Sequence, residues 1–180
     1  PATTCKLYAM PFLPPSDSIV TGASGQPDRP GHVLGALDLG TNNCRLLVAR
    51  PSRTGFRIVD SFSRIVRLGE GLELSGRLSD VAIERTLEAL KICARKIALR
   101  RVSHWRWVAT EACRQAANGG EFLQRVKREV GLDLEVITGE QEAKYAMTGC
   151  QSLLDYEHGH ALIFDVGGGS TELMWLRLER

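Results

Sequence analysis

Two short segments far apart in the sequence have the same layout, and together they constrain the fold more than any other feature. DLGTNNCRL (residues 38–46) and DVGGGSTEL (residues 165–173) each start with an aspartate that follows an apolar stretch, then pass through a glycine-containing turn into a second strand-like stretch. Each predicts a β-hairpin. Glycine lets the backbone adopt positive φ and approach a ligand, and successive turn N–H groups can bind phosphate. One glycine-rich hairpin is usually only a tight turn. Two matching ones predict a pair of phosphate-binding loops.

In the rest of the chain, segments with the apolar pattern of strands alternate with segments whose apolar residues have helical spacing. Apolar and β-branched runs predict strands at residues 33–39, 44–50, 55–68, 105–110 and 134–138. Helical spacing, with Ser79 as the N-cap of the longest segment, predicts helices at residues 79–100, 110–118, 120–131 and 139–154. Three meandering strands followed by helix–strand alternation predict an α/β fold with a mixed five-stranded sheet and flanking helices.

Composition narrows the functional classes. The 180 residues are 43% hydrophobic and carry a net charge of only +2, so we expect one globular domain with no specific nucleic-acid partner. The five cysteines include no CxxC pair, which indicates reduced thiols in a cytoplasmic protein. We found neither an apolar run long enough for a membrane span nor a signal peptide. Residues 1–31 are rich in Pro, Gly and Ser and predict a flexible leader.

The sequence resembles a known family at five places, in order. DLGTNNCRLLVA and FDVGGGSTEL resemble the two phosphate motifs of the actin-like superfold (ribonuclease H-like, ASKHA). RLGEGLELSGRLSDVAIERTLEAL, VATEACRQAANG and VITGEQEAKYAMTG resemble segments of the exopolyphosphatase/guanosine pentaphosphate phosphohydrolase (Ppx/GppA) family. The chain is therefore identified by resemblance as a member of that family over about residues 35–176.

The resemblance implies a fold of two lobes with the active site between them. Residues 32–155 would form lobe I, and residues 156–180 would be the start of a truncated lobe II that contains the second phosphate hairpin. The resemblance leaves open a homodimer of the full-length bacterial protein. We expect an isolated fragment of residues 1–180 to be inactive or nearly so, because its cleft has one complete wall.

The resemblance also implies an activity, namely Mg²⁺-dependent hydrolysis of terminal phosphoanhydride bonds in polyphosphate or guanosine pentaphosphate, the latter linking the protein to the stringent response. Glu142 matches the catalytic base and Glu172 a second catalytic carboxylate, while Asp38 and Asp165 match metal ligands. Without the resemblance, Glu142 and its neighbour Glu140 would be read as solvated carboxylates in the first turn of a helix. The implied phosphate-binding residues are Thr41, Asn42, Arg114, Gly168, Gly169, Ser170 and Thr171.

The sequence alone leaves some positions and alternatives open. Arg45 matches a basic position of the family but lies past the turn, where it could simply pair with a carboxylate, and Asn118 is expected to end its helix. Cys44 departs from the aromatic residue that is usual in the first motif. An actin-like ATPase or sugar kinase would share both hairpins, and a non-catalytic module could bind polyphosphate or the alarmone. The sequence does not choose between the two substrates.

Overall fold

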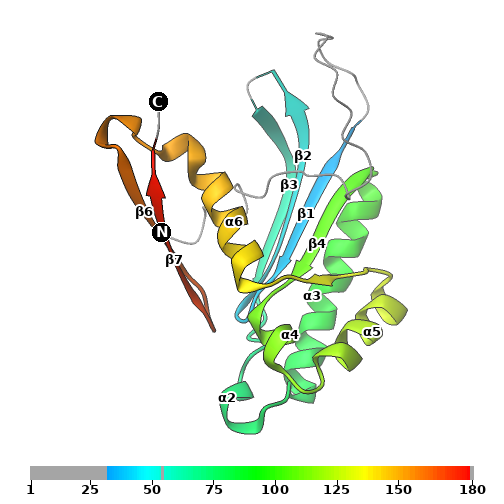
Figure 1. Cartoon of the computed structure of the whole chain (residues 1–180). Helices are drawn as coiled ribbons and strands as arrows, with labels where there is room; N and C mark the ends of the chain where they lie inside the picture. Colours follow the sequence, from blue (N-terminus) through cyan, green and yellow to red (C-terminus); the bar gives the residue numbers. More distant parts are fainter. Residues whose placement is uncertain (1–31, 54, 179–180) are drawn as a thin grey trace.

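The computed structural model describes residues 32–53 and 55–178, and the leader predicted at residues 1–31 lies outside them. A five-stranded sheet with the order β3-β2-β1-β4-β5 forms its centre (Figure 1). β1 pairs antiparallel with β2 and parallel with β4, so the sheet is mixed, as predicted. The strands are β1 (Leu34–Leu39), β2 (Asn43–Ser52), β3 (Gly55–Ile65), β4 (His104–Ala109) and β5 (Glu135–Val136).

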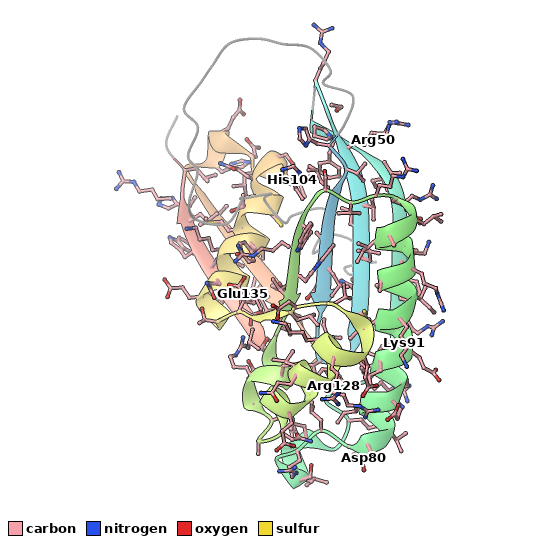
Figure 2. All side chains as sticks on the ribbon, turned by 90° about the vertical axis from the view of Figure 1, so that its right-hand side faces the viewer. Arg50, Asp80, Lys91, His104, Arg128 and Glu135 are labelled. Atoms are coloured by element: carbon pink, nitrogen blue, oxygen red, sulfur yellow. The ribbon has the colours of Figure 1, made fainter. Side chains whose placement is uncertain are left out.

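Helices flank this sheet on both sides (Figure 1). They are α2 (Leu72–Ser75), α3 (Asp80–Leu99), α4 (Glu111–Gln115), α5 (Gly119–Val130) and α6 (Gly139–Cys150). The Ser79 hydroxyl accepts a hydrogen bond from the Ala82 amide, which confirms the predicted N-cap of α3. The polar face of α3 is turned to solvent, with Asp80 at its beginning and Lys91 near its middle (Figure 2).

Alternation along β2 decides what each face of the sheet carries. Cys44, Leu46 and Val48 are fully buried in the main core cluster, to which α3 contributes Leu87 and Leu90. Since successive strand residues point to opposite faces, Arg45 belongs to the other face, the one that also carries Asp38 of β1. One face of the sheet therefore packs as an apolar core, and the other carries charged groups.

Several local predictions differ from the structure. The strand predicted at residues 105–110 forms as β4, but Trp105 near its beginning is 55% exposed, because β5 pairs only with the C-terminal end of β4. Helix α2 was not predicted. The helix predicted at residues 110–118 ends at Gln115, and Asn118 occupies the N-cap position of α5 instead. Its side-chain amide bonds both the N–H and the C=O of Leu78, so the expectation that Asn118 ends its helix was wrong.

The second hairpin forms a separate two-stranded sheet. Its strands are β6 (His160–Val166) and β7 (Thr171–Arg177), and two short 3₁₀ turns (Gln151–Leu153 and Tyr156–His158) connect α6 to it. Asp165 and Glu172 are register partners on the face that includes buried Ile163, while Phe164 and Trp175 on the opposite face are exposed. In the described part of the chain, no helix is both long enough and apolar enough to cross a membrane.

Candidate active site

The first hairpin turn is fixed by backbone hydrogen bonds. The Gly40 amide donates to the Asn43 carbonyl (2.9 Å), which closes the turn between β1 and β2. The Asn42 carbonyl accepts from the Val66 and Arg67 amides, and the Thr41 carbonyl accepts from the Gly69 amide (3.0 Å). Because the carbonyls of Thr41, Asn42 and Asn43 all accept backbone hydrogen bonds, the turn has one defined position at the end of β1. This position is next to the buried carboxylate of Asp38.

The glycines of the second hairpin bring its turn against the first. A Cβ added to Gly168 would lie 2.9 Å from the Asn42 Cβ, and one added to Gly169 would lie 2.8 Å from the Thr41 Oγ1. Both distances are shorter than side-chain packing tolerates. Among the described residues, Gly168 and Gly169 do not belong to the positive-φ glycines. The sequence predicted glycine in this turn partly because glycine can adopt positive φ. In the structure, Gly168 and Gly169 are needed instead because they permit close contact between the two hairpins.

Helix α6 brings Glu142 to the same place. Thr138 and Gln141 form a reciprocal capping box that fixes the start of this helix. Glu142 then lies in the first turn and is only 4% exposed, whereas Glu140 is exposed to solvent. Of the two carboxylates, Glu142, which the family resemblance singled out, is thus the one turned toward the protein interior.

Three carboxylates converge at this point. One carboxylate oxygen each from Glu142, Asp165 and Glu172 lie within 4.8 Å of one another. Asp165 and Glu172 come from paired positions of β6 and β7, so the hairpin register sets their spacing. An all-oxygen donor set of this kind matches the preference of Mg²⁺. These three residues therefore fit the cation expected from the sequence. Of the two metal ligands expected there, Asp165 belongs to this group, whereas Asp38 does not.

Arg114, a residue of α4, lies beside this group of carboxylates. Its guanidinium donates to the Ile137 carbonyl and to the carboxylate of Glu111, and its Nη2 atom lies 3.9 Å from the Glu142 Oε2 atom. The Arg114 side chain is 26% exposed, so part of its fork remains accessible. Arg114 is thus both anchored in the protein and adjacent to the predicted base.

A cleft of about 450 Å³ lies between the two hairpins and α6. The predicted site residues that line it are Asp38, Thr41, Asn42, Glu142, Asp165, Gly168, Gly169 and Ser170. The structure thus brings most of the predicted residues together. Arg114, Thr171 and Glu172 do not line the cleft itself, although Arg114 lies close to Glu142 and Glu172 belongs to the carboxylate group.

Two buried polar residues of the cleft wall, Arg45 and Thr110, were not assigned to the site from the sequence. Arg45 lies directly opposite Asp38 in the β1–β2 register, is 6% exposed, and has no hydrogen bond or ion pair within the described residues. Thr110, at the end of β4, is 3% exposed and also lines the cleft. The signal for Arg45 was present in the sequence, since a tight turn between β1 and β2 pairs position 38 with position 45 on one face.

The comparison with known proteins agrees with this geometry. The model of the Ppx/GppA phosphatase family matches residues 47–179. The guanosine-5'-triphosphate,3'-diphosphate pyrophosphatases of Aeromonas hydrophila and Aeromonas salmonicida are each 37% identical to the chain over 139 residues. That alignment covers 77% of this chain but 28% of each relative, so the chain spans less than a third of the length of these curated proteins.

Solved structures give the same assignment. An exopolyphosphatase from Cytophaga hutchinsonii is 30% identical with a TM-score of 0.77, over 83% of this chain and 48% of that one. The Ppx/GppA family member of Aquifex aeolicus is 35% identical with a TM-score of 0.68, over 82% and 51% of the two chains. These matches and the sheet topology confirm the predicted actin-like fold class. The chain therefore belongs to the Ppx/GppA phosphatase family.

Proposed function

We propose that the gene product hydrolyses terminal phosphoanhydride bonds of inorganic polyphosphate, of guanosine pentaphosphate, or of both, and releases phosphate. The observation that carries this proposal is the convergence of Glu142, Asp165 and Glu172 within 4.8 Å, beside a cleft bordered by two contacting turns. Phosphoryl transfer depends on positioning and on charge stabilisation more than on covalent chemistry, and the cleft offers groups for both tasks.

Phosphate oxygens would be bound by the two turns and by arginine. The side chains of Thr41, Asn42 and Ser170 and the backbone of Gly168 and Gly169 border the cleft, with Thr171 at the start of β7. Arg45 adds a buried guanidinium in the cleft wall, where a bound phosphate could supply the acceptor that the described protein residues do not. Arg114 would contact the phosphoryl group next to Glu142, since its planar fork suits bidentate contact.

Glu142 would act as the general base. It would accept a proton from the attacking water while the water oxygen bonds to the terminal phosphorus and the bridging oxygen leaves with its electron pair. Glu142 is only 4% exposed, which excludes most solvent, and Arg114 nearby limits charge repulsion between the carboxylate and the phosphate. Glu172 would help to orient the water or the metal.

We also propose that Mg²⁺ is held by Asp165, with Asp38 as the ligand from the first hairpin and Glu172 close by. When bound, Mg²⁺ would neutralise phosphate charge. In the proposed domain organisation, residues 32–155 form lobe I, and β6 and β7 begin lobe II, because they form a sheet of their own. Substrate selection would depend on both lobes, and the Aeromonas relatives and the Cytophaga structure carry different substrate names.

The test measures phosphate release from polyphosphate and from guanosine pentaphosphate with Mg²⁺, using the full-length gene product. We expect Glu142→Gln to lower kcat by about 100-fold or more, because it removes the base. Glu140→Gln is the matched control, since Glu140 lies in the same helical turn but is exposed, and it should leave kcat unchanged. Equal activity of wild type and Glu142→Gln would reject the base. Tight binding of either substrate by a wild type that releases no phosphate would indicate a sensor.

A further inference from the structure

Thr110 has an unusual position at the start of α4. It is the N-cap residue of this helix, yet its side chain makes no capping hydrogen bond. Its backbone is bound on both sides, because its amide donates to the Leu39 carbonyl (3.1 Å) and its carbonyl accepts from the Cys113 and Arg114 amides. A threonine at this position normally bonds an amide of its own helix. Here the hydroxyl is left for another partner.

The Thr110 hydroxyl is open to the cleft. The residue as a whole is 3% exposed, and its hydroxyl has no hydrogen-bond partner within residues 32–53 and 55–178. Its Oγ1 atom is not among the fully buried side-chain atoms that lack a partner, so the hydroxyl keeps some accessible surface. Because Thr110 lines the cleft together with Glu142 and Asp38, that surface is available to a water or a ligand in the cleft.

A small recess lies where these three polar side chains meet. It measures about 10 Å³ and is lined by Asp38, Thr110 and Glu142, with Val108, Ile137 and Ala146 among its apolar neighbours. This volume is roughly what the centre of one water molecule needs, and a water in a polar recess requires two or more partners. Thr110 and Glu142 can provide them.

We propose that the recess binds the attacking water and that Thr110 orients it; this inference rests on the proposed hydrolase function. The water donates one hydrogen bond to the Glu142 carboxylate and the other to the Thr110 Oγ1, which leaves an oxygen lone pair directed at the terminal phosphorus. The new P–O bond then forms, the bridging P–O bond breaks with its electron pair on the leaving phosphate, and the proton passes to Glu142.

The test compares Thr110→Val, which keeps the shape and removes the hydroxyl, with Thr110→Ser, which keeps the hydroxyl. In the full-length gene product we expect Thr110→Val to lower kcat about 10- to 100-fold with little change in KM, because ground-state binding does not use the water. Thr110→Ser should retain most of the activity. The melting temperature of Thr110→Val should stay the same or rise, since no protein hydrogen bond is lost.

Thr86→Val is the matched control. Thr86 is also buried, but its hydroxyl donates to the Ala82 carbonyl within α3 (2.7 Å), away from the cleft, so kcat should not change. Wild-type kcat in Thr110→Val would overturn the role of Thr110 and leave the hydrolase intact. A lowered melting temperature with no rescue by serine would indicate a structural role and also overturn it. A wild type that releases no phosphate from either substrate would overturn the hydrolase and this inference together.

Discussion

The Nη2 atom of Arg114 lies 3.9 Å from the Oε2 atom of Glu142, although α5 and β5 separate their two helices in the sequence. Further contacts to Glu111 and to the Ile137 carbonyl hold the guanidinium in this position. A residue from the loop before α6 and a residue from α4 thus fix the cation next to the proposed base. The position of Arg114 is set by the protein before any substrate binds.

Replacement of Arg114 by lysine should therefore show whether phosphate release depends on the positive charge at position 114 or on the planar geometry of the guanidinium. Lysine keeps the positive charge but cannot bond Ile137, Glu111 and a phosphate with one planar group. We expect kcat/KM for phosphate release to fall about 10- to 100-fold, and the free energy of unfolding to fall by about 1 kcal/mol through the lost contacts. Arg128→Lys, at a side chain that is 69% exposed on α5, is the control and should match wild type. Wild-type kinetics in Arg114→Lys would exclude a bidentate role.

The contact between the two turns gives a second prediction. Gly168→Ala places a methyl group 2.9 Å from the Asn42 Cβ, which is not the end of a flexible side chain and cannot move away easily. We expect the turns to separate, phosphate release to fall at least about tenfold, and the free energy of unfolding to fall by about 1–3 kcal/mol. Enzyme kinetics and urea unfolding measure the two effects.

Gly120→Ala is the matched control for this change. Gly120 lies in α5, has no atom within 4 Å of an added Cβ, and does not belong to the positive-φ glycines. Alanine there should raise the free energy of unfolding by up to about 1 kcal/mol through helix propensity and leave activity unchanged. If both substitutions behaved alike, the turn contact would have no functional importance.

The parts of the site that were predictable from the sequence are those encoded locally. A strand-end aspartate, a glycine turn and a helical period are each visible within about ten residues, so the hairpins at Asp38 and Asp165 and the helix that carries Glu142 were placed correctly. The N-cap at Ser79 was predictable for the same reason. The roles of the site residues came from the family resemblance, because no local sequence pattern specifies a catalytic or binding role.

The parts that were missed depend on packing between distant segments. Arg45 becomes a cleft residue because the turn register sets it opposite Asp38, and Thr110 because the end of β4 lies beside the end of β1. Likewise, Gly168 and Gly169 are required by the contact with Thr41 and Asn42, which lie more than a hundred positions earlier in the sequence. A single sequence does not specify such contacts until the topology is known.

An ion-pair group outside the site predicts how stability depends on pH. Asp60 of β3 accepts hydrogen bonds from Lys96 (2.7 Å) and Arg100 (2.9 Å) of α3, and its side chain is only 12% exposed. These contacts, that of Lys96 first, hold the pKa of the Asp60 carboxyl below its ordinary value. A lowered pKa in the folded state means that stabilisation is present above the unfolded pKa, about 4, and is lost as the pH falls through the folded value.

Asp60→Asn should therefore lower the free energy of unfolding at neutral pH by about 1–2 kcal/mol. The difference from wild type should shrink as the pH falls below about 4, where the wild-type carboxylate also becomes neutral. Urea unfolding at neutral pH and at about pH 3 measures both values. Asp133→Asn is the control, because the Asp133–Lys127 pair is 73% and 64% exposed and should contribute less than about 1 kcal/mol. A difference that persisted at low pH would show that packing at Asp60, and not its charge, stabilises the protein.

The cysteines predict a pattern of chemical reactivity. A hydrogen bond to Cys93, whose sulfur lies 3.9 Å away, raises the pKa of the buried Cys44 thiol, and burial raises the pKa of Cys113 to about 12. Since the thiolate is the reactive form, Cys44 and Cys113 should resist iodoacetamide at mildly alkaline pH, whereas half-buried Cys150 should react. Peptide mass spectrometry identifies the labelled sites. Labelling of Cys113 as rapid as that of Cys150 without denaturant would contradict the buried environment.

The proposed cation site can be tested without relying on turnover. Asp165 and Glu172 face each other across β6 and β7, and Glu142 brings a third carboxylate oxygen within 4.8 Å. Removal of one of these charges by Asp165→Asn should raise the Mg²⁺ concentration that half-saturates phosphate release about tenfold or more. Electron paramagnetic resonance titration with Mn²⁺, in the absence of substrate, should show a similar loss of affinity. Glu157→Gln is the control, because Glu157 is exposed in the turn before β6 and should leave both values unchanged. If Asp165→Asn bound Mn²⁺ as tightly as wild type, the cation would have to bind elsewhere, and the carboxylate group would serve only the substrate and the water.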